Sequence, residues 1–249
     1  LSDTSGESAT SWWSALLVGG TIALACLIRP SWLFAAPLFA LVLIWSSSCK
    51  RRAVMHASVV CLGTLGALLP WVLRNHEITG HWVLTTLWVG PSLYDGLNPD
   101  ADGSSNMQYF DDENLSARMT EFEVDQTYRQ RARAYAVEHP GRVMQLAFAK
   151  LWRFWKPWPN ARQFRHWWGI ALTSVFFVPL IALAFWGFRT STGDRWNWLL
   201  TLGPAIYFSA IHMIFVASLR YRLPVEYPLS VLSAVGLRNL WLNSGGRNS

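Results

Sequence analysis

The sequence WWGIALTSVFFVPLIALAFWGF, residues 167–188, decides the fold class of this chain, because it runs through 22 positions without a charged side chain. An apolar helix of roughly 20 residues spans the hydrocarbon core of a bilayer, which is about 30 Å thick. Five more stretches are nearly as apolar, at about 12–28, 31–48, 54–73, 196–218 and 225–243. The sequence therefore predicts an all-α integral membrane protein with about six transmembrane helices.

The composition supports a membrane protein and argues against several other classes. Hydrophobic residues make up 52% of the chain and charged residues only 14%, whereas about 25% of residues are charged in soluble domains. The chain has 16 tryptophans, which gather at membrane interfaces. The net charge of +6 suits anionic lipid or phosphate, but no long basic run or RNA-binding motif indicates nucleic acid. The three cysteines lack metal-binding spacing, so we expect free thiols, no metal site and no cofactor.

The apolar stretches fall into two groups separated by a long polar segment. We expect three transmembrane helices in residues 1–74, an external segment at 75–166, and three more transmembrane helices in 167–249. Short loops on one side of this arrangement carry seven lysines and arginines, against four at the opposite membrane edge. Positive charge is enriched in short cytoplasmic loops. Both termini are therefore predicted to be cytoplasmic, and the polar segment to be non-cytoplasmic.

The external segment is predicted to contain a loop followed by two helices. Residues 82–88 have a β-like pattern, and 90–103 are rich in Gly, Pro, Asn and Asp, which indicates a loop. Helical patterns follow at about 115–138 and 141–155. The second helix would carry Val143, Leu146, Ala147, Leu151 and Phe154 on an apolar side, and Arg142, Gln145, Lys150, Arg153 and Lys156 on a polar side. This amphipathic pattern predicts a helix lying in the membrane interface.

Four arginines stand where apolar stretches end on the predicted external side: Arg29, Arg74, Arg220 and Arg222. Charged side chains are costly at the hydrocarbon edge, and planar guanidinium groups bind phosphate oxygens through two hydrogen bonds. The pattern therefore predicts a cationic rim that binds a lipid phosphate. The alternative is that each arginine reaches water or caps a helix C-terminus. Glu226 lies one helical turn beyond Arg222, where it would hold this arginine in place or, alternatively, act in catalysis.

Two further patterns each allow a functional and a structural interpretation. The stretch NPDADG at 98–103 resembles the first half of a calcium-binding loop, but Tyr109 occupies the twelfth position, which needs a glutamate. We therefore expect Asx-turns there, although a carboxylate of this loop could face a bound donor. His212 lies within the fifth apolar stretch, where an ionisable side chain is either a functional candidate or a hydrogen-bonded part of helix packing.

Five short motifs occur in order along the chain: GTIALACLIRP at 20–30, LPWVLRN at 69–75, GPSLYDGLNP at 90–99, a helix from His-Pro to Phe-Trp at 139–155, and RYRLPVE at 220–226. Together they resemble bacterial membrane glycosyltransferases of the GT-C type. These enzymes are related to the dolichyl-phosphate-mannose protein mannosyltransferases and to the aminoarabinose transferase of lipid A. The resemblance covers nearly the whole chain and matches it to the C-terminal part of the family.

The resemblance implies a glycosyltransferase of the bacterial inner membrane that moves a sugar from a polyprenyl-phosphate donor to a lipid, glycan or protein acceptor. Its site would face away from the cytoplasm, with membrane lipid and the donor as partners. The family's catalytic carboxylate lies in an external loop that would precede Leu1, so we expect a fragment in which no catalytic residue is assigned. Candidate donor or acceptor contacts are Asn75, Tyr94, Asp95, Asn98, Tyr221 and Glu226.

Two other interpretations stay open at this point. Six helices could form part of a transporter or flippase for a lipid-linked glycan, which should place polar or broken helices at mid-membrane. Here the charges lie at the edges and only His212 lies deeper, which favours the enzyme. The chain could also be an inactive fragment.

Overall fold

The computed structural model describes residues 12–160, 166–191 and 195–245, and within these ranges every regular element is a helix. This confirms the all-helical fold class. The chain divides into two compact units, Leu1–Leu87 and Trp88–Ser249, which we describe separately. These units differ from the predicted segments 1–74, 75–166 and 167–249, because packing contacts and not membrane position define them.

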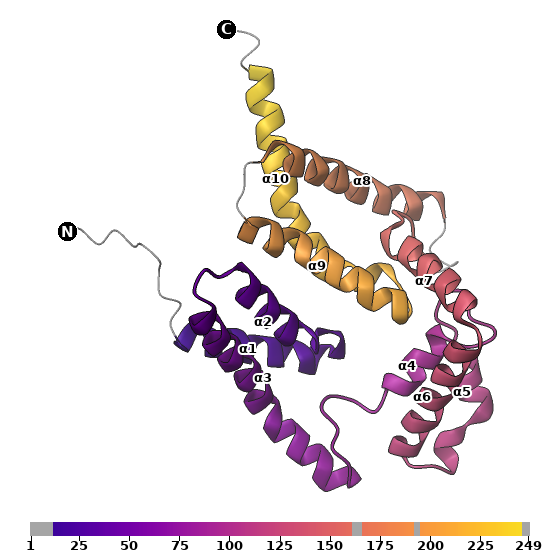
Figure 1. The fold of residues 1–249 in the computed structure, drawn as a ribbon. Coiled ribbons are helices and arrows are strands. Elements are labelled where there is room, and N and C mark those ends of the chain that lie inside the picture. The colour runs from indigo at the N-terminus through magenta and orange to yellow at the C-terminus, as the bar shows by residue number, and fades with distance from the viewer. Residues whose placement is uncertain (1–11, 161–165, 192–194, 246–249) are drawn as a thin grey trace. The chain divides into compact units, whose positions relative to one another are not determined.

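The first unit contains α1 (Trp12–Ile28), the short helix η1 (Pro30–Trp32), α2 (Ala35–Ser46) and α3 (Lys50–Thr79). Both α1 and α2 pack on α3 (Figure 1). At Gly19 of α1, a Cβ atom would lie 2.6 Å from the Val60 carbonyl oxygen. Thr64 Oγ1 also donates a hydrogen bond of 3.1 Å to the Gly19 carbonyl. The absence of a side chain at Gly19 therefore lets two apolar helices meet backbone to backbone.

Helix α3 is longer than the apolar stretch predicted at 54–73. It continues to Thr79 and ends at Gly80, whose φ of 72° suits glycine and whose amide donates to the His76 carbonyl. Arg74 and Asn75, which follow the apolar stretch, therefore lie inside the last turns of this helix.

Residues 82–88 form an irregular segment, so the predicted β-like run is wrong. Two of its carbonyls accept hydrogen bonds from side chains of α3. Asn75 Nδ2 donates to the Val83 carbonyl and Trp71 Nε1 to the Thr85 carbonyl, each at 3.0 Å. These two hydrogen bonds hold the segment on α3. The described part of the chain contains no strand with which the segment could pair.

Helix α4 (Val89–Gly96) opens the second unit, where the density of glycine and proline had predicted only a loop. Pro91 lies in the first turn of the helix, where its missing amide costs no hydrogen bond. Gly90 lies against α6 (Glu121–Glu138): its amide donates to Asp125 Oδ1 at 2.5 Å, and a Cβ atom would collide with the Asp125 backbone. Pro91 therefore favours the start of the helix, and Gly90 allows α4 to pack closely on α6.

The polar part of the second unit, residues 88–156, is called the α4–α7 body below. It also contains α5 (Gln108–Glu113), the short helix η2 (Leu115–Ala117) and α7 (Pro140–Trp155). The helices predicted at about 115–138 and 141–155 are confirmed as α6 and α7. Helix α6 begins at a capping box in which Thr120 and Glu123 each accept from the other's backbone amide. Helix α7 begins with Pro140 in its first position.

The chain then forms α8 (Trp167–Thr190), α9 (Arg195–Ile214), the short helix η4 (Leu219–Tyr221) and α10 (Leu223–Gly245). Helices α8 and α10 cross and pack against each other (Figure 1). A Cβ atom on Gly187 or Gly236 would collide with the backbone of the other helix. Ser233 Oγ adds a 2.8 Å hydrogen bond to the Leu180 carbonyl. This seam therefore repeats the small-residue packing of α1 on α3.

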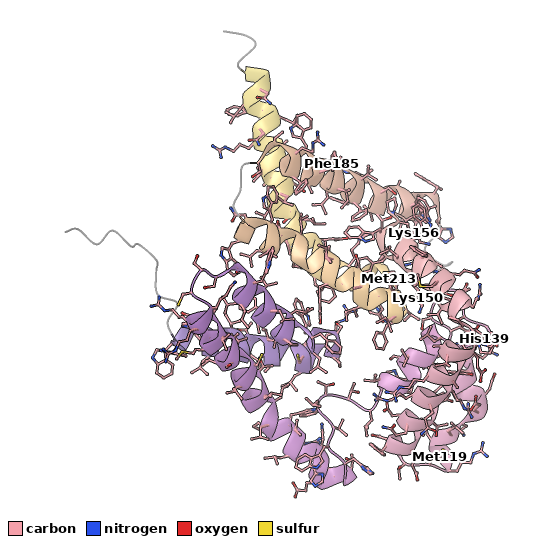
Figure 2. The ribbon with its side chains drawn as sticks, in the orientation of Figure 1. Met119, His139, Lys150, Lys156, Phe185 and Met213 are labelled. Atoms are coloured by element: carbon pink, nitrogen blue, oxygen red, sulfur yellow. The ribbon has the colours of Figure 1, made fainter. Side chains whose placement is uncertain are left out.

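Among the residues that the structure describes, two helices, α3 and α8, are long and apolar enough to cross a membrane. In α8 only 17% of the most apolar window is buried, and Phe185, for example, is 63% exposed (Figure 2). Helix α1 and the region Pro30–Ser46 are apolar but shorter. The structure therefore supports membrane association weakly, through α3 and α8, and the count of six transmembrane helices stays a prediction.

Candidate functional site

A polar pocket of about 490 Å³ lies in the α4–α7 body, between the end of α4, the following loop and α5. Its wall includes four aspartates: Asp95, Asp100, Asp102 and Asp112. Further lining residues are Tyr94, Asn98, Ser104, Asn106, Gln108 and Tyr109. Three of the candidate contacts named from the sequence, Tyr94, Asp95 and Asn98, therefore meet in one pocket.

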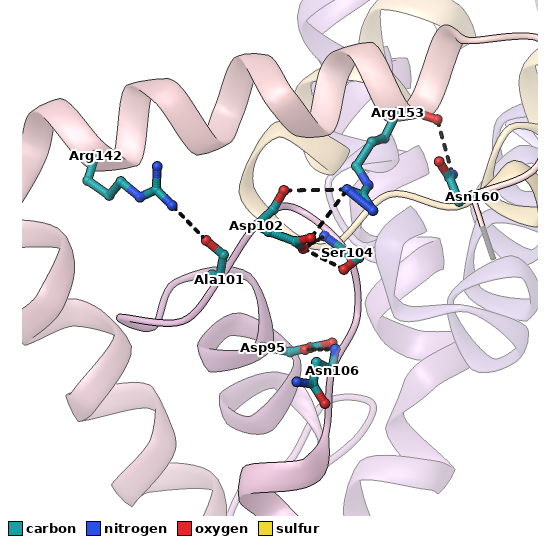
Figure 3. A network of polar contacts seen from close by, with 8 residues as sticks. All are labelled: Asp95, Ala101, Asp102, Ser104, Asn106, Arg142, Arg153 and Asn160. Atoms are coloured by element: carbon teal, nitrogen blue, oxygen red, sulfur yellow. Dashed lines mark hydrogen bonds and ion pairs between the residues drawn. The ribbon is translucent and has the colours of Figure 1, made fainter. Parts of the chain in front are cut away.

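Asp95 is the most deeply buried of these four aspartates, with 4% of its surface exposed. Its Oδ2 accepts a hydrogen bond from Ser105 Oγ at 2.6 Å. Its Oδ1 accepts one from the Asn106 amide at 2.8 Å (Figure 3). Burial raises the pKa of Asp95, and these two hydrogen bonds oppose that rise. The loop at 97–106 thus holds the carboxylate in a fixed orientation.

This loop is built on Asx-turns, as its sequence predicted. Asn98 Oδ1 accepts a hydrogen bond from the Asp100 amide at 2.9 Å. Asp102 Oδ1 accepts one from the Ser104 amide at 2.7 Å. Across the residues that the structure describes, no three His, Cys, Asp or Glu side chains are grouped so that they could hold a metal ion.

The polar side of α7 holds the loop in place (Figure 3). Arg142 Nη2 donates to the Ala101 carbonyl at 3.0 Å, and Arg153 Nη1 reaches the Asp102 carbonyl at 3.5 Å. The Arg153 guanidinium also lies 3.8 Å from the Asp102 carboxylate. Arg142 and Arg153 therefore contact the pocket loop. The amphipathic pattern of α7 had predicted only a polar side for them.

Lys150 is fully buried in the same body, so its predicted place on the polar side of α7 is wrong (Figure 2). Its Nζ donates a 2.6 Å hydrogen bond to the Ile214 carbonyl at the end of α9. Burial lowers the pKa of Lys150 to about 8, and the negative charge of Asp95 partly opposes that shift. One signal in the sequence indicated this burial: Lys150 lies four residues from both Leu146 and Phe154, which are core residues of the same helix face.

Gly96 lets α4, α7 and α9 meet at this lysine. A Cβ atom at Gly96 would lie 2.9 Å from both Lys150 Nζ and the Ile214 carbonyl oxygen. The C-terminal carbonyls of α9 favour a cation at this place. The buried ammonium group of Lys150 therefore lies beside Gly96, which follows Asp95 in the chain. It is outside the lining of the acidic pocket.

Arg222 is 4% exposed, and its Nε and Nη1 groups bond to the protein. Its Nε donates to Glu226 Oε1 at 2.6 Å, which confirms the predicted pairing. Its Nη1 donates to the carbonyls of Lys156 at 3.0 Å and Phe154 at 3.3 Å, at the end of α7. The guanidinium carbon lies 3.4 Å from the centroid of the Phe177 ring on α8. Arg222 therefore ties α7, α8 and α10 together, and Lys156, expected on the polar side, is buried beside it.

Arg220, in η4, is exposed. Its Nη2 donates to the Tyr221 hydroxyl at 3.0 Å, and its guanidinium carbon lies 4.9 Å from the centroid of the Tyr221 ring. The Tyr221 ring stacks on His212 at 5.0 Å, and His212 stacks on Phe154 at 5.3 Å. His212 Nδ1 bonds to the Val216 carbonyl at 2.9 Å. This geometry fits the structural interpretation of His212, as a hydrogen-bonded part of helix packing.

The remaining candidates belong to the first unit. Arg74 is exposed, and its guanidinium carbon lies 5.1 Å from the centroid of the Trp71 ring. Asn75 is buried and bonds to the Val83 carbonyl, so it holds the segment that follows α3. Arg29 is half-buried at the turn between α1 and η1. A rim that unites Arg29 and Arg74 with the arginines of the second unit stays a prediction.

Comparisons with known proteins supply no evidence about the function of this chain. No family model, no curated protein and no solved structure matches the chain. The resemblance to membrane glycosyltransferases therefore rests on the five sequence motifs alone.

Proposed function

We propose that this chain is part of a membrane glycosyltransferase that uses a polyprenyl-phosphate sugar donor on the non-cytoplasmic face of the bacterial inner membrane. The sugar would pass to a lipid, glycan or protein acceptor. The observation that carries the proposal is Arg220, an exposed cation bonded to Tyr221 at the turn between α9 and α10. Helices α3 and α8 are long and apolar enough to cross a membrane, which supports the membrane setting that a lipid-linked donor requires. The five motifs of the sequence favour the same chemistry.

An exposed arginine in the turn between α9 and α10 suits the phosphate of a lipid-linked sugar. The guanidinium presents its N–H donors in a planar fork that matches phosphate oxygens. The stack of Tyr221 on His212 and Phe154 restricts the turn before the donor arrives, which lowers the entropy lost on binding. As the sugar leaves, negative charge builds up on the phosphate, and a fixed cation stabilises that charge.

The proposal gives the two arginines of this turn different roles. Arg222 would fix the turn, because it is buried and bonded to Glu226 and to the end of α7. Arg220 would contact the donor phosphate. Glu226 is engaged with Arg222, whereas Asp95, a candidate donor or acceptor contact, lines a pocket.

The test is donor binding by the full chain in lipid nanodiscs, measured by native mass spectrometry with undecaprenyl phosphate as the probe. Arg220→Ala should weaken binding about ten- to a hundredfold, which is the loss expected for one charge-assisted phosphate contact. Arg189→Ala is the matched control, because Arg189 is also exposed and lies in the last turn of the apolar helix α8. The control should bind like the wild type. Unchanged binding by Arg220→Ala would contradict the proposal.

A further inference from the structure

The pocket at the end of α4 differs in chemistry from a phosphate site. Four aspartates line it, and its described lining includes no lysine or arginine. An anionic ligand would be repelled by this wall, and the repulsion grows as water is excluded. A ligand of this pocket is therefore neutral or cationic.

A metal ion is also a poor fit. Both carboxylate oxygens of Asp95 already accept hydrogen bonds, from Ser105 and Asn106. Asp102 Oδ1 accepts one from the Ser104 amide. Within the described ranges, no three aspartate, glutamate, histidine or cysteine side chains are placed so that they could hold one metal ion, the four pocket aspartates included. The pocket thus lacks the convergent oxygen ligands that Ca²⁺ or Mg²⁺ needs.

We propose that this pocket binds an uncharged, hydroxyl-rich ligand, namely a sugar. The inference rests on the proposed function for the role of that sugar as a substrate, while the binding itself is tested independently. Oriented carboxylate and amide oxygens accept hydrogen bonds from hydroxyl groups, and the rings of Tyr94 and Tyr109 offer apolar surface. A carboxylate has about four acceptor positions, so Asp95 can accept hydrogen bonds from ligand hydroxyls in addition to those from Ser105 and Asn106.

The aromatic wall is held in place by packing within the protein. The rings of Tyr94 and Tyr109 meet edge to face at 5.0 Å, and they contact the buried ring of Tyr128 at 5.5 Å and 5.2 Å. The Tyr109 hydroxyl also donates to the Pro91 carbonyl at 2.8 Å. Little side-chain entropy is therefore lost when a ligand binds against these rings.

Lys150 balances the acidic wall from inside the protein. Its ammonium group lies beside Gly96, directly after Asp95 in the chain, and bonds to the Ile214 carbonyl. This positive charge favours the ionised form of Asp95, although burial raises its pKa. Hydrogen bonds from hydroxyls to an ionised carboxylate are roughly twice as strong as those to a neutral acceptor. The buried lysine therefore supports hydroxyl binding without entering the pocket.

The test uses saturation-transfer difference NMR on the full chain in nanodiscs. The probes are methyl α-glucopyranoside, methyl α-mannopyranoside, methyl β-galactopyranoside and methyl β-xylopyranoside, and at least one should bind. Asp112→Asn should weaken that binding about three- to tenfold, because a charged acceptor becomes a neutral one. Asp111→Asn is the matched control, since Asp111 is the adjacent exposed aspartate of α5 and does not line the pocket. Asp95→Asn should weaken binding by about tenfold or more.

The inference is overturned if no probe glycoside binds the wild type, or if Asp111→Asn and Asp112→Asn weaken binding equally. Calcium binding that Asp112→Asn abolishes, without glycoside binding, would also overturn it and identify a cation site. The donor experiment on Arg220 is separate. Glycoside binding with no effect of Arg220→Ala on undecaprenyl phosphate would reject the proposed function alone, and the opposite pair of results would reject only the sugar pocket.

Discussion

The α4–α7 body and helix α8 belong to the same unit, yet the body buries charged side chains and α8 exposes large apolar ones. The body encloses the charged side chains of Asp125 and Lys150, both at 0% exposure. Helix α8 buries Phe177 against Arg222 and otherwise the small residues Gly169, Ala184 and Gly187, and it exposes large apolar side chains such as Phe176, at 72%. Large apolar groups gain from burial only when the alternative is water, and small residues line helix seams in lipid. The difference indicates that the two parts face different surroundings.

The two parts are also held together by different forces. In the body, Asp125 accepts hydrogen bonds of 2.5 Å from both the Gly90 amide and Arg129 Nη2. Buried charges need such partners, because an unpaired charge is costly in the interior. The seam of α8 and α10 relies instead on the absence of side chains at Gly187 and Gly236. Substitutions that add a side chain should therefore destabilise the packing of α8 on α10. Substitutions that remove or unpair a buried charge should destabilise the α4–α7 body.

The largest effect is expected from adding one methyl group to the seam. In Gly236→Ala the new Cβ atom would collide with the Leu183 carbonyl on α8, so the helices must separate. We expect the free energy of unfolding to fall by about 3 kcal/mol. Gly203→Ala in α9 is the control, since nothing lies within 4 Å of its Cβ position, and it should be neutral or stabilising by up to about 1 kcal/mol. Thermal unfolding in detergent measures both variants. Equal stability of Gly236→Ala and Gly203→Ala would contradict the close packing of α8 on α10.

The free energy of unfolding should depend on pH in the alkaline range, because the α4–α7 body contains the buried Lys150. Burial lowers its pKa from 10.5 to about 8. Between these values the folded state binds fewer protons than the unfolded state, so stability rises with pH across this window, by about 2–3 kcal/mol at most. Lys150→Met removes this titration. The difference in unfolding free energy between wild type and variant, measured from pH 7.5 to 10.5, should therefore rise with pH, and a constant difference would show that the lysine is not desolvated.

The smallest effect is expected where the two parts meet at Arg222. Arg222→Ala leaves Glu226 and the carbonyls of Phe154 and Lys156 without this donor, which should cost about 2 kcal/mol of unfolding free energy. Arg220→Ala removes an exposed side chain and should change stability by less than about 0.5 kcal/mol. Thermal unfolding of the two variants compares them directly. An equal loss in both would show that Arg220 is a structural residue too.

Local sequence signals predicted the helices of the body well and its charges poorly. Helix α7 begins at Pro140, within one residue of its predicted start, whereas α6 begins at Glu121, after its capping box, and not at about 115 as predicted. The glycine and proline at the start of α4 were misinterpreted as loop residues. The role of Gly90 depends on Asp125, which lies 35 positions away and is not visible in a local pattern.

The candidate site was predicted in part. Tyr94, Asp95 and Asn98 were named from the sequence and meet in one pocket, and the pairing of Arg222 with Glu226 follows from a spacing of four residues. Lys150 was missed, because a lysine in an amphipathic pattern is ordinarily assigned to the polar side. Its partner, the Ile214 carbonyl, lies 64 positions away.

The sequence by itself determined the all-helical fold class, the apolar helices and the Asx-turns of the pocket loop, because these depend on residues within a few positions of one another. Only the tertiary structure decided which cation is exposed and which are buried. Arg220 and Arg222 are two residues apart and chemically identical, yet Arg222 packs on Phe177 and Arg220 does not. Exposure is set by the packing of distant helices, and a short motif contains no information about that packing.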